Sequence, residues 1–322
     1  MTQGWLSLPA LLAVSGIASA EGWVGTFQSG LTYTDNLEVA ADSSTATDTP
    51  GSLTRGGVKT GISLNRQVLD GTGGYVLESS ASLNKGWAGR KDIRQARLAA
   101  YRLAALNQDW LLRAGVQGDA YTNGDVPTES YQGVGAEATL GYMGKTNSGT
   151  DIALTFKQER HPAYRMGRSA MKLAHYFPHR KGQAYWSLRG TYQQDAATDD
   201  SLDGAGNALG IGYEQWSLGA FKGTAEVEWQ QKQYDQRQTR GTPPPGMFPP
   251  GGVPPAGMTL AQREDTTARA TISLSKPLKK NLNVHLSSSI GQYASTSGVN
   301  PMDTAGTKER FNSFSAGLRW DF

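Results

Sequence analysis

The segment Ser315-Ala316-Gly317-Leu318-Arg319-Trp320-Asp321-Phe322 lies at the C-terminal end of the chain, and its residue pattern indicates the fold. Every second side chain in it is apolar, and the side chains between them are small, polar or charged. This period of two is typical of a β-strand with one apolar face. An apolar strand at the end of a chain is an aggregation-prone edge unless another strand covers it. The segment therefore predicts a sheet that closes on itself.

The same alternation recurs along most of the chain. Val134 and Leu140, for example, share an apolar face, and Glu137 lies on the opposite one. Such segments predict an all-β chain of about 14 strands, at 22–34, 55–66, 73–85, 93–105, 110–122, 131–143, 150–160, 167–177, 184–195, 206–216, 223–235, 264–276, 283–294 and 310–322. A helix over 93–106 is the alternative for one segment.

Spacing and length separate a membrane barrel from a soluble one. The segments recur roughly every 22 residues, whereas soluble sandwiches turn about every 8–12 residues. Their lengths match the ~9–11 residues that a tilted strand needs to cross a bilayer. Short connections such as 106–109 alternate with long ones such as 236–263. This asymmetry is typical of outer-membrane proteins and predicts a transmembrane antiparallel up-and-down β-barrel.

Composition excludes several other classes of protein. Glycine makes up 40 of the 322 residues, cysteine is absent and the formal net charge is +3. Without cysteine, disulfide frameworks and cysteine-ligated zinc are excluded. The near balance of charge argues against a surface that coats nucleic acid, so no nucleic-acid partner is expected. No apolar run after residue 20 is long enough for a transmembrane helix.

Aromatic residues gather near the ends of the predicted strands. At the short-turn ends lie Trp23, Trp110, Tyr142, Trp186, Trp216, Trp320 and Phe322. Near the long loops lie Tyr33, Trp87, Tyr121, Tyr131, Tyr192, Tyr234 and Tyr293. Two such belts are typical of rings at the two headgroup layers of a membrane. A general preference of aromatic residues for strand ends is the alternative.

Residues 1–20 have the features of an export signal. The apolar stretch from Leu6 to Ala13 is too short to span a bilayer, and Ala18-Ser19-Ala20 matches a small-residue cleavage site. A cleaved signal peptide over 1–20 is therefore expected, with the barrel occupying 21–322. A buried N-terminal helix is the alternative, which Pro9 disfavours.

The last strand resembles the C-terminal assembly signal of bacterial outer-membrane proteins. The matching residues are Ser315, Gly317, Trp320 and Phe322. The resemblance implies recognition by the β-barrel assembly machinery and pairing of the last strand with the first. A weaker resemblance, carried by the stretch from Gly30 to Leu37, is to the barrel domain of surface-lipoprotein assembly modifiers.

The face opposite the apolar stripe carries charges of both signs. Because a basic side chain facing lipid costs ~2–4 kcal/mol at the bilayer midplane, these residues are expected to face the lumen. The basic candidates are Lys59, Arg102, Arg113, Lys157, Lys172, Arg189, Arg269 and Arg319, and the acidic candidates are Glu78, Asp119, Glu137, Glu159, Glu214, Glu226 and Glu228. They either ring an aqueous channel of weak ion selectivity or pair to stiffen a closed barrel.

No motif for catalysis or cofactor binding is evident. The histidines lack zinc-protease spacing, and the glycine-rich stretch from Gly133 to Ala138 lies within a strand rather than at a nucleotide-binding turn. No enzyme activity, cofactor or metal is expected. The Pro-rich stretch within 236–263 cannot extend the sheet, because proline lacks the backbone N–H. It is expected to plug the lumen, to present an external binding surface or to be a disordered loop.

These features predict a single barrel in the outer membrane of a Gram-negative bacterium. The leading hypothesis is a porin-like channel for small polar solutes, by analogy of architecture. One alternative is the barrel of an export or surface-assembly system with a separate periplasmic partner. Another is a non-conducting surface protein that binds through its Pro-rich loop. Membrane lipid and lipopolysaccharide are the expected surroundings.

Overall fold

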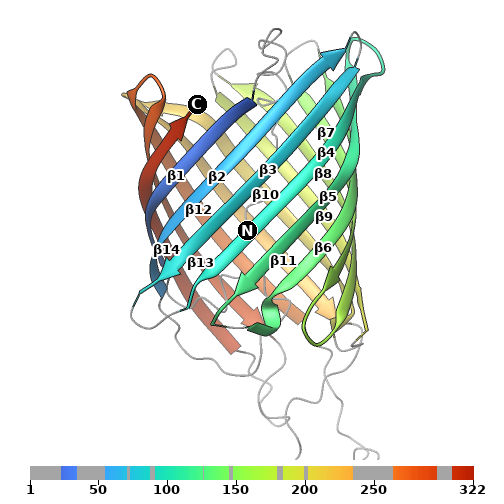
Figure 1. Ribbon diagram of the computed structural model, residues 1–322, viewed down its shortest axis with the longest axis vertical. Helices are drawn as coiled ribbons and strands as arrows, with labels where there is room; N and C mark the ends of the chain where they lie inside the picture. The colour runs from blue at the N-terminus through green and yellow to red at the C-terminus, as the bar shows by residue number, and fades with distance from the viewer. Residues whose placement is uncertain are drawn as a thin grey trace, which may run out of the picture.

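The computed structural model is a closed barrel of antiparallel strands, each inclined to the barrel axis (Figure 1). The described residues are 23–34, 55–70, 73–87, 91–125, 127–144, 148–179, 184–198, 202–234, 264–295 and 307–322. The predicted signal peptide over 1–20 and the Pro-rich loop over 236–263 therefore lie outside the described residues.

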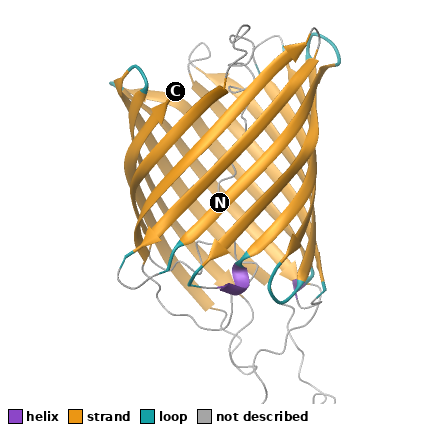
Figure 2. Cartoon of the chain, in the orientation of Figure 1, coloured by secondary structure: helices purple, strands orange, loops and turns teal. Residues whose placement is uncertain are grey.

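Strands make up nearly all of the described chain (Figure 2). They are β1 (Trp23–Thr34), β2 (Arg55–Asp70), β3 (Gly73–Gly86), β4 (Ile93–Ala105), β5 (Trp110–Asn123), β6 (Tyr131–Met143), β7 (Gly149–Arg160), β8 (Arg165–His179), β9 (Ala184–Ala197), β10 (Gly204–Leu218), β11 (Phe221–Tyr234), β12 (Glu264–Lys279), β13 (Leu282–Ser295) and β14 (Thr307–Asp321). A short helical turn, η1 (Pro127–Glu129), precedes β6. The helix alternative over 93–106 is wrong, because β4 occupies that range. No helix among the described residues is long and apolar enough to cross a membrane.

The barrel closes between its first and last strands. β1 pairs with β2 on one side and with β14 on the other, as the last strand's resemblance implied. Gly25 and Phe322 exchange backbone hydrogen bonds of 2.7 and 2.8 Å at the end of this seam. A Cβ atom at Gly25 would lie 2.3 Å from the Phe322 ring, so only glycine leaves room for that ring. Closure removes the free sheet edges that an open apolar sheet would expose.

Alternation along each strand gives the barrel an apolar exterior. Leu98, Val116, Val134 and Phe156 come from four adjoining strands and are 61–66% exposed. Residues of the opposite parity face the interior, where buried apolar contacts form small groups such as Val76 with Tyr101. In a closed sheet every strand has a partner on both sides, so the backbone N–H and C=O groups bond within the sheet. Such a sheet with an apolar exterior can therefore lie in a bilayer.

The aromatic belts are only partly as predicted. Tyr33, Trp87 and Tyr192 are exposed on the outward face near the long connections. The expectation was wrong for the four other tyrosines at that end, whose strand parity points them inward, namely Tyr121, Tyr131, Tyr234 and Tyr293.

Trp216 reaches the outer surface through a local irregularity of β10. A β-bulge lies between Glu214 and Trp216, and Gln215 has a positive φ of 58°. The extra residue reverses the parity of the strand, so that the Trp216 ring lies over Gly223 of β11. A bulge commonly redirects a side chain in this way.

Candidate functional site

The inner surface of the barrel divides into two walls of different chemistry. We call the inward-facing side chains of β3–β11 the charged wall, because ion pairs connect many of them. We call those of β12, β13, β14, β1 and β2 the hydroxyl wall. The five strands of the hydroxyl wall are consecutive in the closed sheet. The two walls therefore face each other across one lumen.

The first ion-pair network of the charged wall centres on Arg113 of β5. Its guanidinium lies 2.9 Å from the carboxylate of Glu78 on β3 and 3.8 Å from that of Glu137 on β6. The same group lies over the Tyr101 ring, 3.6 Å from the ring centroid. All three charged side chains are at most 20% exposed, so one cation holds two carboxylates against the wall.

The second network runs across five strands near the long connections. Lys157 of β7 contacts Asp119 at 2.8 Å and Glu159 at 2.7 Å. Arg168 of β8 continues the series, 3.6 Å from Glu159 and 3.0 Å from Asp195 of β9. The Asp195 carboxylate also accepts a hydrogen bond of 2.8 Å from Lys232 of β11. Cations and anions alternate along this row, and its two central carboxylates are almost completely buried.

Arg189 and Arg269 form three further ion pairs of the inner wall. Arg189 of β9 pairs with Glu214 of β10 and, at 2.8 Å, with Glu226 of β11. Arg269 of β12 reaches Glu228 of β11 at 3.5 Å and thereby joins the hydroxyl wall to the charged wall. Each cation here neutralises at least one carboxylate.

The charged wall is therefore held together by its own charges. Removing a buried ion from water is costly, and mutual attraction compensates only when the partners stay in place. Because these side chains are mostly hidden by their partners, they present a nearly neutral surface to the lumen.

Many inward side chains of the hydroxyl wall are short instead. Thr271 and Ser289 share a hydrogen bond of 2.9 Å, as do Ser273 and Ser287. The remaining inward positions are largely small or polar and include Thr26, Gly30, Thr32, Gly57, Gly61, Ser63, Ser313, Ser315 and Gly317. Short side chains leave space, and a hydroxyl group both donates and accepts hydrogen bonds.

The predicted lumen residues are not equivalent in the structure. The paired residues are Arg113, Asp119, Glu137, Lys157, Arg189, Glu226, Glu228 and Arg269. Lys59 faces inward from β2, is exposed and forms no ion pair with the described residues. Arg319 lies near the short-turn end of β14 and pairs with Asp321 at 2.8 Å.

The inward assignment of Arg102 was wrong. On β4 the inward parity belongs to Arg97, Ala99 and Tyr101, whereas Arg102 lies on the outer surface. There its guanidinium covers the Tyr75 ring at 4.3 Å and binds Asp70 at 2.9 Å. The nearby short turn places this cation at the edge of the apolar band, where charge is tolerated.

The sequence interpretation also missed several inward charged residues, among them Arg97, Arg168, Asp195 and Lys232. Their position in the alternation could have identified them. Arg168 lies on the same face of β8 as Lys172, and Lys232 lies on the same face of β11 as Glu226. They lie away from the strand centres, where the apolar alternation weakens. Sequence alone gave no reason to expect Arg168 and Lys232 to share one carboxylate.

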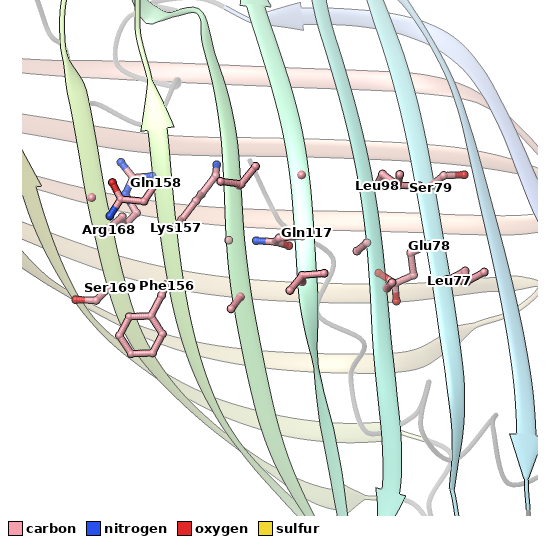
Figure 3. Close-up of a pocket in the computed structure, with 18 of the residues that line it drawn as sticks. Leu77, Glu78, Ser79, Leu98, Gln117, Phe156, Lys157, Gln158, Arg168 and Ser169 are labelled. Atoms are coloured by element: carbon pink, nitrogen blue, oxygen red, sulfur yellow. The ribbon is translucent and has the colours of Figure 1, made fainter.

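A hollow of about 1170 Å³ follows β3–β9 (Figure 3). Its apolar lining comes from Leu98, Val116, Val134 and Phe156, which belong to the outer surface. Inward residues such as Lys157 also contribute to its lining. The apolar side chains place the hollow along the exterior, so it is not the lumen.

Comparison with known proteins finds likeness only at the level of structure. No family model and no curated protein matches the chain. An anion-selective porin from Comamonas acidovorans is 12% identical with a TM-score of 0.45, covering 94% of this chain and 99% of the porin. OprB of Pseudomonas putida is 9% identical with a TM-score of 0.48, covering 99% and 97%. OmpT, an outer membrane protein of Vibrio cholerae, is 10% identical with a TM-score of 0.48, covering 94% and 98%.

At such low identities these structures show a likeness of fold alone. The chain's own surface is more informative: a closed sheet surrounds a polar interior and turns apolar side chains outward. This arrangement needs hydrocarbon around it and leaves no strand edge unpaired. The chain is thus a fourteen-strand β-barrel of a bacterial outer membrane.

Proposed function

We propose that the barrel is a water-filled channel for small polar solutes. The observation that carries this proposal is the hydroxyl wall, where five consecutive strands present many short hydroxyl side chains and glycines to the interior. Hydroxyl groups exchange hydrogen bonds with water and with polar solutes without holding an ion strongly.

The channel is expected to discriminate weakly between cations and anions. The inner charges of the charged wall are mostly paired, and Lys59 is an exposed cation on the opposite side. Ion selectivity depends on rings of charge that remain uncompensated along the pore. A slight preference for anions is therefore expected.

Planar-bilayer recording of the purified full chain tests conduction. The proposal expects discrete current steps at low voltage and a small reversal potential in a KCl gradient. Folded protein, identified by its altered mobility when heated before electrophoresis, that gives no steps would overturn the proposal. That outcome would instead favour a non-conducting surface protein.

Two neighbouring serines of β13 provide a matched pair of variants. Ser287 faces inward and bonds Ser273, whereas Ser288 is exposed on the outer surface. Ser287→Trp should reduce the single-channel conductance because the indole occupies lumen space, and Ser288→Trp should leave it unchanged because that side chain faces lipid. Equal conductance in both variants would contradict the assignment of the hydroxyl wall to the permeation path.

We also infer that residues 1–20 direct export and that Ser315, Gly317, Trp320 and Phe322 form the assembly signal. The exposed outward position of Trp320 and Phe322 at the barrel seam supports the second inference. The mass of the mature chain should match a start at Glu21. Deleting Phe322 should lower the amount of folded barrel in the membrane while synthesis continues.

A further inference from the structure

Two arginines face each other on the outer surface of the barrel. Arg160 ends β7 and Arg165 begins β8, and they are direct cross-strand partners. Both are exposed and share the outward parity of Phe156 and Met171. Neither side chain forms an ion pair or a hydrogen bond with any described residue.

Opposed like charges are unfavourable, because the two side chains lie only about 5 Å apart at their Cβ atoms. The hairpin also holds them together: His161 N–H bonds the Tyr164 carbonyl at 2.9 Å, and the two rings stack at 4.2 Å. The arginines therefore cannot separate by moving their backbones. An anion bound between the two guanidinium groups would remove their repulsion.

The inner face of the same two strands offers an internal comparison. There Lys157 and Arg168 are also direct cross-strand partners. Three carboxylates surround that inner pair, namely Asp119, Glu159 and Asp195. The chain thus supplies its own anions inside the barrel. Around the outer pair, the described residues supply none.

The outer side chains below the arginines change in a definite order toward the short turns. Next to Arg160 and Arg165 come Gln158 and Gly167, with the Gln158 amide 3.0 Å from where a Cβ at Gly167 would lie. The following outward positions include Phe156 and Met171, which are strongly exposed. The outer surface therefore changes from charged to amide to apolar side chains. A lipid changes in the same order, from its phosphate group through the interface to its acyl chains.

We propose that Arg160 and Arg165 bind the phosphate groups of an anionic lipid in the leaflet at the long-connection end. One phosphate between two guanidinium groups accepts several charge-assisted hydrogen bonds and removes their repulsion. The acyl chains of that lipid lie along Phe156 and Met171. The site is on the exterior, so it does not depend on conduction through the lumen.

The test compares lipid retention by the full-length barrel and its variants. Protein is incorporated into phosphatidylcholine nanodiscs containing a minor fraction of bis-phosphorylated lipid A, and bound lipid A is measured by native mass spectrometry. The double variant Arg160→Gln/Arg165→Gln should lower its apparent affinity about twentyfold, since each arginine near a charged membrane surface contributes appreciably. Unchanged retention would overturn the proposal.

The matched control is Arg94→Gln on β4. Arg94 also faces outward near the long connections, but Asp92 lies 3.9 Å from its guanidinium. An arginine with its own carboxylate should contribute little, so this variant should retain lipid A as the parent does. An equal loss in Arg94→Gln would show general surface attraction and overturn a specific site.

A charge reversal separates loss of binding from loss of fold. Arg165→Glu places a carboxylate opposite Arg160, so the variant supplies the missing anion itself. In detergent without lipid A it should be at least as heat-stable as the parent, yet lose the lipid-dependent stabilisation. If lipid A still stabilises this variant as much as the parent, the phosphate assignment is wrong.

The source of the phosphate is resolved by competition. Inorganic phosphate at millimolar concentration should displace little lipid A, because it lacks the acyl chains that contact the apolar surface. Dephosphorylated lipid A should bind the parent and the double variant equally. Full displacement by inorganic phosphate would reassign the site to a free anion and overturn the lipid proposal.

Discussion

The charged wall and the hydroxyl wall enclose the same lumen but differ in how their polar groups are satisfied. Ion pairs satisfy the groups of the charged wall, whereas the hydroxyl wall keeps groups that can still bond water. In the charged wall, Asp195 and Glu159 are buried among their cations, and each is held by at least two of them. In the hydroxyl wall, Ser287 and Ser289 make single hydrogen bonds across neighbouring strands. The charged wall is therefore tied together across its strands, and under the proposed function the hydroxyl wall lines the path of the solute.

Removing the buried carboxylate of Asp195 from the charged wall should destabilise the barrel more than any other change considered below. Asp195→Asn removes the anion that Arg168 and Lys232 share, leaving poorly compensated cations. Because breaking a buried ion pair from one side costs about 3–5 kcal/mol, the free energy of unfolding should fall by about that amount. Urea unfolding in lipid vesicles measures it.

The hydroxyl wall supplies the contrast for this measurement. Ser289→Ala loses only the hydrogen bond to Thr271 and should cost about 0.5–1.5 kcal/mol. If Asp195→Asn and Ser289→Ala lower the free energy of unfolding equally, the two walls do not differ in their contribution to stability.

The next effect concerns the close approach of backbones at the barrel seam. Gly317 faces Gly30, and a Cβ at Gly317 would lie 2.5 Å from the Ser29 carbonyl oxygen. Gly317→Ala should therefore destabilise the barrel by about 1–3 kcal/mol. At Gly118 the nearest atom to such a Cβ is 3.8 Å away, so Gly118→Ala should be neutral or stabilise by up to ~1 kcal/mol. Thermal unfolding followed by heat-dependent gel mobility ranks the two variants.

Ion selectivity distinguishes the two walls in a second way. Arg113→Gln leaves Glu78 and Glu137 without their cation and should raise the K⁺/Cl⁻ permeability ratio about fivefold, since a unit charge at short range in water is worth roughly 1 kcal/mol. Reversal potentials in a KCl gradient measure the ratio. Lys59→Gln should shift the ratio in the same direction while changing stability by less than ~0.5 kcal/mol. A stability loss in Lys59→Gln as large as in Arg113→Gln would erase the distinction between paired and unpaired charges.

The smallest effect lies outside both walls, at Glu129 of η1. Burial raises the pKa of this carboxyl above its ordinary value of 4.5, and the hydrogen bond that Asn123 donates to it opposes that shift. Since the folded chain favours the neutral form, ionisation of Glu129 lowers stability as the pH rises above about 4.5. Glu129→Gln should be slightly stabilising at pH 7 and indistinguishable from the parent near pH 3. Urea unfolding at both pH values checks the sign, and stabilisation that persists at the lower pH would contradict it.

The strands and their faces could be predicted because the alternation is local. Val134 and Glu137 differ in parity, and that alone places one outward and the other inward once a barrel is assumed. The prediction failed where alternation gave little signal. Arg102 follows the alanine-rich run of β4, and Tyr234 and Tyr293 lie at strand ends.

The ion-pair networks were beyond prediction for a different reason. Lys157 and Asp119 are 38 residues apart, and their contact depends on the register of β5, β6 and β7. A shift of one residue in any pair would turn charges toward lipid. The bulge at Gln215 has a similar effect on Trp216 and carries no signature in the sequence.

The amino-acid sequence was enough to predict an all-β barrel, since period-two alternation and strand length are properties of short segments. It also determined that both signs of charge occur on one face. The folded barrel was needed to show which charges meet, that the ion-pair networks gather on β3–β11, and that Arg160 opposes Arg165. These features depend on register and closure, which join residues far apart in the chain and are fixed only when all strands pair.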